Sequence, residues 1–209
     1  MIELFQITGS CSFAARAALE EIGCEYTTID IHPRRRDEIP AFAEVNPLQR
    51  VPALREGPEQ VYETGAVLAY LGDRFPADNV APQSTDPDRG AYLRWLFWLS
   101  NTLHDAWWPV GRKVDGADDR MRAHEAYIEH QLGAGEYCLG DRFSLADIYL
   151  YMLVGWRSFY GEGLMQGATV QAHFERIGAR PAIVRTRELD DLRPDFQRYH
   201  PQLRAGKPV

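Results

Sequence analysis

The sequence predicts an α/β first part followed by an all-helical second part. Short apolar strands alternate with helical patterns early in the chain, and a stretch rich in proline, aspartate and serine follows at 76–89. Every later apolar segment has the spacing of a helix. We therefore expect an α/β domain over 1–78, a linker over 79–89 and an all-helical domain over 90–209.

The composition is that of an ordinary globular protein. The chain has 209 residues, of which 45% are hydrophobic and 25% charged, and its net charge of −7 argues against nucleic-acid binding. No apolar run approaches the ~20 residues of a membrane helix, and the N-terminus lacks the features of a signal peptide. The sparse cysteines Cys11, Cys24 and Cys138 form neither a disulfide framework nor a zinc pattern. We expect no membrane contact, no bound metal and a cytoplasmic location.

The first elements form a strand-helix-strand unit. Strands are expected at 2–7 and 26–31, with a helix at 13–22 between them. Gly23 ends this helix as a glycine that adopts the left-handed conformation. A unit of this length predicts parallel strands joined by a right-handed crossover.

The rest of the α/β part follows in short segments. We expect a short helix at 40–45, a hairpin from 51–55 and 60–62, and a helix at 65–74. The order β-α-β-α-β-β-α is typical of a thioredoxin-like domain.

The second part consists of apolar helical patterns. Helices are expected at 90–108, 118–132, 144–159, 170–177 and 183–192. Ser144 and Asp147 match a capping box, with Phe143 and Ile148 as its hydrophobic staple. This motif predicts the start of a buried helix and a role in folding.

The turn before the first helix, "TGSCSFAAR", contains Cys11. A redox C-x-x-C motif would place a second cysteine at position 14, but Ala14 stands there, so the motif cannot form an internal disulfide. The unpaired N–H groups at the start of a helix favour a thiolate at Cys11. The alternative is that Cys11 is an inert small residue in a tight turn.

Two further pairs of residues precede regular elements. Pro52 opens a strand, where a thioredoxin-like domain typically has a cis peptide that exposes the backbone of Val51, although an ordinary trans proline is the alternative. Glu63 and Thr64 precede a helix, where the hydroxyl and N–H groups can hold a carboxylate and Glu63 an amine. The alternative for this pair is a simple helix cap with a solvated acid.

Four segments carry a resemblance to the cytosolic glutathione S-transferases over essentially the whole chain: "GSCSFAARAALEEIG", "NPLQRVPALREG", "VYETGAVLAYLGDRFP" and "CLGDRFSLADIYLY". The resemblance implies the glutathione S-transferase fold, with a thioredoxin-like N-terminal domain that binds glutathione and an all-α C-terminal domain that shapes an electrophile pocket. It implies a cytoplasmic homodimeric enzyme that uses glutathione as co-substrate and has no permanently bound cofactor.

The turn most resembles that of the bacterial beta class, in which the cysteine, here Cys11, lies near the glutathione sulfur. That class also has a histidine in the first long helix of the second domain, which His104 matches, whereas Asp105 replaces the lysine that follows it. In the related zeta class a serine activates the thiol, so Ser10 and Ser12 remain alternatives.

The resemblance also implies the residues that bind glutathione. Val51, next to Pro52, would bond its cysteinyl backbone, and Glu63 and Thr64 would hold its γ-glutamyl group, although the family usually has serine in place of Thr64. Charge complementarity with the glycyl carboxylate points to Arg34 together with Gln49 or Arg50. The electrophile would lie among the aromatic residues Trp107, Trp108, Phe159 and Tyr160.

The expected reaction adds the glutathione thiolate to a small hydrophobic electrophile. If Cys11 itself ionises, a mixed disulfide with glutathione would make the protein a thiol-transferase or disulfide reductase instead. A third possibility is a non-catalytic binding protein that keeps the fold.

Overall fold

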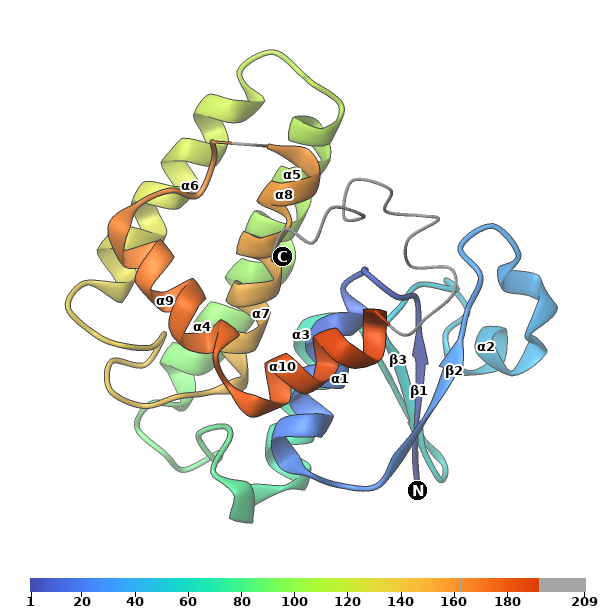
Figure 1. The fold of residues 1–209 in the computed structure, drawn as a ribbon. Helices are drawn as coiled ribbons and strands as arrows, with labels where there is room; N and C mark the ends of the chain where they lie inside the picture. Colours follow the sequence, from blue (N-terminus) through green and yellow to red (C-terminus); the bar gives the residue numbers. More distant parts are fainter. Residues whose placement is uncertain (162, 192–209) are drawn as a thin grey trace.

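The N-terminal part contains one four-stranded mixed sheet. The computed structural model describes residues 1–161 and 163–191. The strands are β1 (Ile2–Gln6), β2 (Tyr26–Asp30), β3 (Ala53–Glu56) and β4 (Glu59–Tyr62), in the order β2-β1-β3-β4 (Figure 1). β1 pairs in parallel with β2 and antiparallel with β3, which pairs antiparallel with β4. The predicted thioredoxin-like arrangement is confirmed.

The helices of this part pack on both faces of the sheet because β1 is apolar on both sides. They are α1 (Ser12–Ile22), α2 (Pro40–Val45) and α3 (Thr64–Arg74), with 3₁₀ turns at Arg36–Glu38 and Pro76–Asp78. Leu4 belongs to the main core with α1 and α3, whereas its neighbour Phe5 stacks on Phe42 of α2. Gly23 ends α1 with a φ of 72°, as predicted.

The second part is helical, as predicted. Its helices are α4 (Arg89–Trp98), α5 (His104–Gly111), α6 (Ala117–Leu132), α7 (Leu145–Gly155), α8 (Arg157–Tyr160), α9 (Ala168–Gly178) and α10 (Pro181–Asp191). The predicted helix at 90–108 is interrupted by a π-helical turn at Leu99–Leu103, and the one at 144–159 is divided at Trp156. Residue 192 of the last predicted helix, and the rest of the chain to residue 209, lie outside the described residues.

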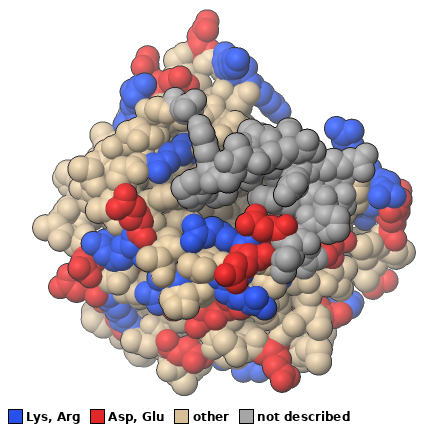
Figure 2. All heavy atoms as spheres, in the orientation of Figure 1, with Lys and Arg blue, Asp and Glu red and all other residues tan. Residues whose placement is uncertain are grey.

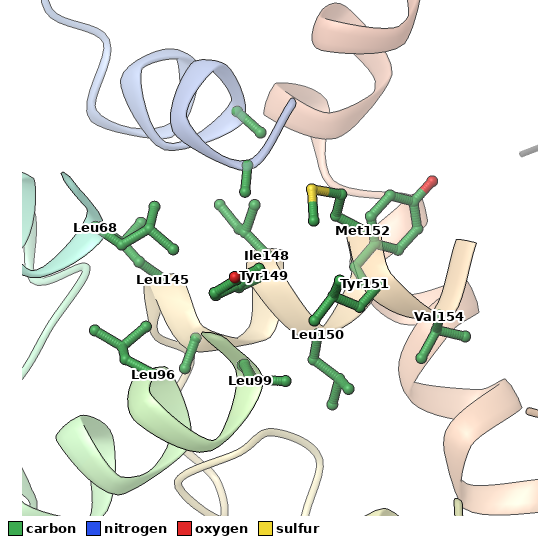
Figure 3. Packing of buried hydrophobic residues seen from close by; sticks show 14 of the residues in the cluster. Leu68, Leu96, Leu99, Leu145, Ile148, Tyr149, Leu150, Tyr151, Met152 and Val154 are labelled. Carbon is green, nitrogen blue, oxygen red and sulfur yellow. The ribbon is translucent and has the colours of Figure 1, made fainter. Parts of the chain in front are cut away.

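α7 lies at the centre of the core. Every residue from Leu145 to Gly155 is buried, and α7 contacts α1, α3, α4 and α9 (Figure 3). The predicted capping box at Ser144 and Asp147 is present. The stretch at 76–89 is tied to this helix, because the carbonyl of Val80 accepts a hydrogen bond from the N–H of Leu145.

The surface carries side chains of both signs. Lys and Arg are interspersed with Asp and Glu over the face drawn in Figure 2. Among the helices of the described residues, none has the length and apolarity to cross a membrane.

Candidate functional site

The serines on either side of Cys11 hold the turn between β1 and α1. The Ser10 hydroxyl donates to the Ile7 carbonyl at 2.6 Å, and the Ser12 hydroxyl oxygen accepts from the Ile7 N–H at 3.2 Å. Ser12 is only 1% exposed. Both predicted serines therefore shape the turn from within, and the Cys11 thiol is the side chain that the turn directs across to Val51.

Cys11 is the N-cap residue of α1, and its thiol donates to the Val51 carbonyl at 2.8 Å. The Thr64 side chain acts to lower the pKa of this thiol. Desolvation is stronger, and with the nearby Glu63 charge it raises the pKa of Cys11 to about 11. Burial therefore outweighs the effect of the helix start, and a pKa of about 11 corresponds to a neutral Cys11 thiol at pH 7 in the ligand-free protein.

The segment before β3 presents the backbone of Val51. The Val51-Pro52 peptide is cis, which confirms that prediction. Asn46, fully buried, donates from its side-chain amide to the Arg50 carbonyl at 2.7 Å and accepts from the Leu48 N–H at 3.0 Å. Sequence reasoning missed Asn46, although an asparagine before a proline is a known signal for a turn.

Glu63 and Thr64 lie at the start of α3. Glu63 is exposed and its backbone has a φ of 71°. Residues other than glycine rarely adopt this conformation, and those that do cluster at functional sites. No side chain caps α3, so its first N–H groups are not satisfied by a neighbouring residue's side chain. Thr64 is 5% exposed, and its side chain acts on the pKa of the Cys11 thiol.

The basic residues lie at the rim near this segment. Arg34 and Arg50 are exposed, and Gln49 is half-buried. Sequence analysis did not single out Arg36, whose guanidinium donates to the Gln49 carbonyl at 2.8 Å and to the Pro33 carbonyl at 3.1 Å. Arg36 therefore ties the basic loop to the residues before Val51.

His104 is the first residue of α5, directly after the π-helical turn. Its Nδ1 lies 3.1 Å from the hydroxyl of Tyr149 on α7, and its ring meets that of Trp156 edge to face. Desolvation lowers the pKa of His104, partly offset by Asp105, so the ring is neutral at pH 7. Tyr149 escaped sequence analysis because its position in an apolar helix predicts only a core residue.

The predicted electrophile residues form a cluster around Tyr160. Its ring centroid lies 6.2 Å from Trp107, 6.5 Å from Trp108 and 6.3 Å from Phe159. Trp108 is 49% exposed and Tyr160 37%, whereas Trp107 is fully buried and belongs to the core.

One group of potential metal ligands occurs among the described residues: the buried Cys138, Asp147 and His173. Asp147 Oδ1 accepts from the Cys138 N–H at 2.7 Å and lies 2.9 Å from His173 Nε2, while Oδ2 accepts from the Ser144 N–H at 2.8 Å. Because both carboxylate oxygens are already used by protein donors, this group caps α7 and fastens α9 to it.

Comparisons with known proteins agree with this geometry. The family model described as "Glutathione S-transferase, N-terminal domain" matches residues 1–73, and "Glutathione S-transferase, C-terminal domain" matches residues 66–200. Glutathione S-transferase GstA of Escherichia coli O157:H7 is 25% identical over 191 residues, which span 87% of this chain and 95% of that protein.

Solved structures with the same fold include a sphingomonad glutathione S-transferase in complex with glutathione. It is 30% identical, with a TM-score of 0.83 over 91% of this chain and 100% of that one. A bacterial beta-class glutathione S-transferase from Sphingomonas chungbukensis is 28% identical, with a TM-score of 0.81 over 91% and 100% of the two chains.

Proposed function

Because the chain belongs to the glutathione S-transferase family of enzymes, we propose that it binds glutathione and adds its thiolate to a small hydrophobic electrophile. One observation carries the proposal. The backbone of Val51, the Cys11 thiol and the uncapped start of α3 meet at one place, with the Cys11 thiol bonded to the Val51 carbonyl at 2.8 Å. A peptide ligand needs such a backbone edge, and a carboxylate needs such a helix start.

Glutathione would lie in an extended conformation along Val51. Its cysteinyl N–H would take the Val51 carbonyl that the Cys11 thiol now occupies, which releases the Cys11 S–H to donate to the glutathione sulfur. The γ-glutamyl carboxylate would bind at Thr64 and the first N–H groups of α3, with Glu63 beside the amine. Arg34 with Gln49 or Arg50 would bind the glycyl carboxylate.

The chemistry then follows from the protonation of Cys11. A free thiol such as that of glutathione has a pKa of about 8.5, so glutathione alone is only slightly ionised at pH 7. A neutral Cys11 is a donor to the glutathione thiolate and not a competing nucleophile. Each unit by which the site lowers the pKa of the glutathione thiol stabilises the thiolate relative to the thiol by about 1.4 kcal/mol.

The second candidate is thiol transfer through Cys11, which would form a mixed disulfide with glutathione while a disulfide substrate is reduced. The lack of a second cysteine within the turn favours it over dithiol exchange. The raised pKa of Cys11 disfavours it, because a thiolate is the attacking species.

Two experiments test both candidates. The first measures retention of the protein on glutathione-agarose, and the second assays conjugation and disulfide reduction in Cys11→Ser and Cys11→Ala. For conjugation we expect the serine variant, which keeps a donor, to retain more activity than the alanine variant. Loss of disulfide reduction in both, with conjugation unchanged in both, would instead assign Cys11 to thiol transfer. If the protein is not retained, the glutathione proposal fails, and retention without either activity favours a binding protein.

We also propose a cytoplasmic homodimer. Support comes from the free cysteines and from Leu48 and Phe97, large apolar side chains that are each 64% exposed on one chain. A mass by light scattering equal to that of one chain, 23.8 kDa, would contradict the dimer.

A further inference from the structure

We propose that Arg36 is a positioning residue, which fixes the backbone that presents Val51 and does not itself contact the ligand. The inference rests on the proposed function, because the ligand along Val51 is glutathione. It separates Arg36 from Arg34, the arginine of the same loop that is proposed to bind the glycyl carboxylate.

Three successive carbonyl groups before β3 are each held by a side chain. The carbonyls of 49–51 accept hydrogen bonds, in chain order, from Arg36 at 2.8 Å, Asn46 at 2.7 Å and Cys11 at 2.8 Å. The three donors come from the 3₁₀ turn at Arg36–Glu38, from the residue that follows α2 and from the N-cap of α1. The backbone that leads to the proposed ligand is therefore fixed from three separate parts of the domain.

Gln49 is the strained residue of this segment. Its backbone has a φ of 49°, in the left-handed region that residues other than glycine rarely adopt. Its N–H donates to the Asn46 carbonyl at 2.8 Å, which closes a turn, and its own carbonyl accepts from Arg36. Because Val51 lies only two residues further on, the bond from Arg36 that supports this conformation also supports the position of Val51.

The chemistry of the arginine side chain suits this task. Arg36 is half-buried, and its Nε donates to the Pro33 carbonyl at 3.1 Å while Nη1 donates to Gln49. A guanidinium stays charged and holds its donors in one rigid plane, so bonding two carbonyls at once fixes their relative position. Bonds from a charged donor are also stronger than those from a neutral one.

Arg35 provides a matched control at the neighbouring position. It is exposed and pairs with Glu38, which is also exposed, at 3.1 Å. Arg36→Met and Arg35→Met both replace a cationic side chain of the same loop with an unbranched neutral one. Of the two arginines, Arg36 is the one whose side chain donates to the segment before β3.

The first experiment measures amide hydrogen exchange by NMR in the full chain without glutathione. The N–H groups of Leu48 and Gln49 donate to Asn46, so their exchange reports opening of the turn. We expect Arg36→Met to speed exchange at both amides about three- to ten-fold, and Arg35→Met to change neither. Unchanged exchange in Arg36→Met, or equal changes in the two variants, would overturn the proposal.

The second experiment distinguishes positioning from direct contact with the ligand. Calorimetric titration measures the Kd of glutathione and of its monoethyl ester, in which the glycyl carboxylate is esterified and uncharged. We expect Arg36→Met to weaken both ligands by the same factor, about three- to ten-fold, because both need the backbone of Val51. A loss confined to glutathione would overturn the proposal, since Arg36 would then bind the glycyl carboxylate itself.

The two experiments also separate this inference from the proposed function. If the original protein binds neither glutathione nor the ester, the proposed function fails. The exchange rates of Leu48 and Gln49 need no ligand, so they still decide whether Arg36 fixes this segment.

Discussion

Burial controls the protonation of the Cys11 thiol. Its position at the start of α1 would favour the thiolate, and the Thr64 hydroxyl acts in the same direction. Removing the sulfur from water acts against the charged form and outweighs both effects. A cysteine at a helix start is therefore a hydrogen-bond donor here, and its contact with the Val51 carbonyl agrees with this state.

Alkylation of Cys11 in the ligand-free protein should show this directly. Because the pKa of Cys11 is raised to about 11, we expect its reaction with iodoacetamide to be slow at pH 7 and to keep rising beyond pH 10. Free glutathione, with a pKa of about 8.5, is the reference thiol. A Cys11 rate that levels off below the reference pKa would show that the thiolate is stabilised after all.

The packing of α3 depends on a glycine at one point of contact. A Cβ atom on Gly72 would lie 2.4 Å from the Cβ of Ala81, in the segment that leads toward α4. A Cβ on Gly90, in α4, would meet no atom within 4 Å. The two positions are both helical and differ in the space around them.

Gly72→Ala and Gly90→Ala should therefore change stability in opposite directions. We expect Gly72→Ala to lower the free energy of unfolding by about 1–3 kcal/mol, because Ala81 has no flexible end that can move aside. Gly90→Ala should raise it by up to about 1 kcal/mol through helix propensity alone. Urea denaturation of both variants measures the difference, and equal shifts would show that Gly72 is not in close contact.

The first and the last helix of the described residues, α1 and α10, pack against each other. α10 lies against α1 (Figure 1), and the buried Arg16 of α1 pairs with the buried Asp190 of α10 at 3.2 Å. Arg180, directly before α10, forms a second ion pair with Glu21 of α1. Desolvation raises the pKa of Asp190 to about 6, although Arg16 acts in the opposite direction.

This shift predicts a dependence of stability on pH. Between pH 3.8, the ordinary pKa of an aspartate side chain, and about pH 6, the folded state holds the Asp190 proton and the unfolded state does not. The contribution of Asp190 to the free energy of unfolding is therefore greatest at low pH and falls as pH rises through this range, by about 3 kcal/mol in total. Carboxyl groups with lowered pKa values, such as Glu3 and Glu56, act in the opposite sense but are common to any variant of Asp190.

The difference between the original protein and Asp190→Asn isolates the effect. Unfolding measured by denaturant at several pH values should show the original protein losing stability relative to Asp190→Asn as pH rises from about 4 to 6. Asp191→Asn, at the exposed neighbour, should keep the pH dependence of the original protein. A constant difference between the original protein and Asp190→Asn would show that Asp190 does not titrate in this range.

The order of the elements was predictable because its signals are local. Helical spacing, the glycine at position 23, the proline at 52 and the capping box of Ser144 and Asp147 each act within a few residues. The interruption at Leu99–Leu103 was not predicted, because the apolar pattern continues through a π-helical turn.

The candidate site was predictable as a set of positions and not as chemistry. Local patterns and resemblance pointed to Cys11, Val51 and Thr64, which the fold brings together. The neutral state of Cys11 and the contact between His104 and Tyr149 depend on burial and on neighbours far away along the chain. Desolvation and long-range contacts are properties of the packed molecule, so the folded structure alone determines which groups carry the protons.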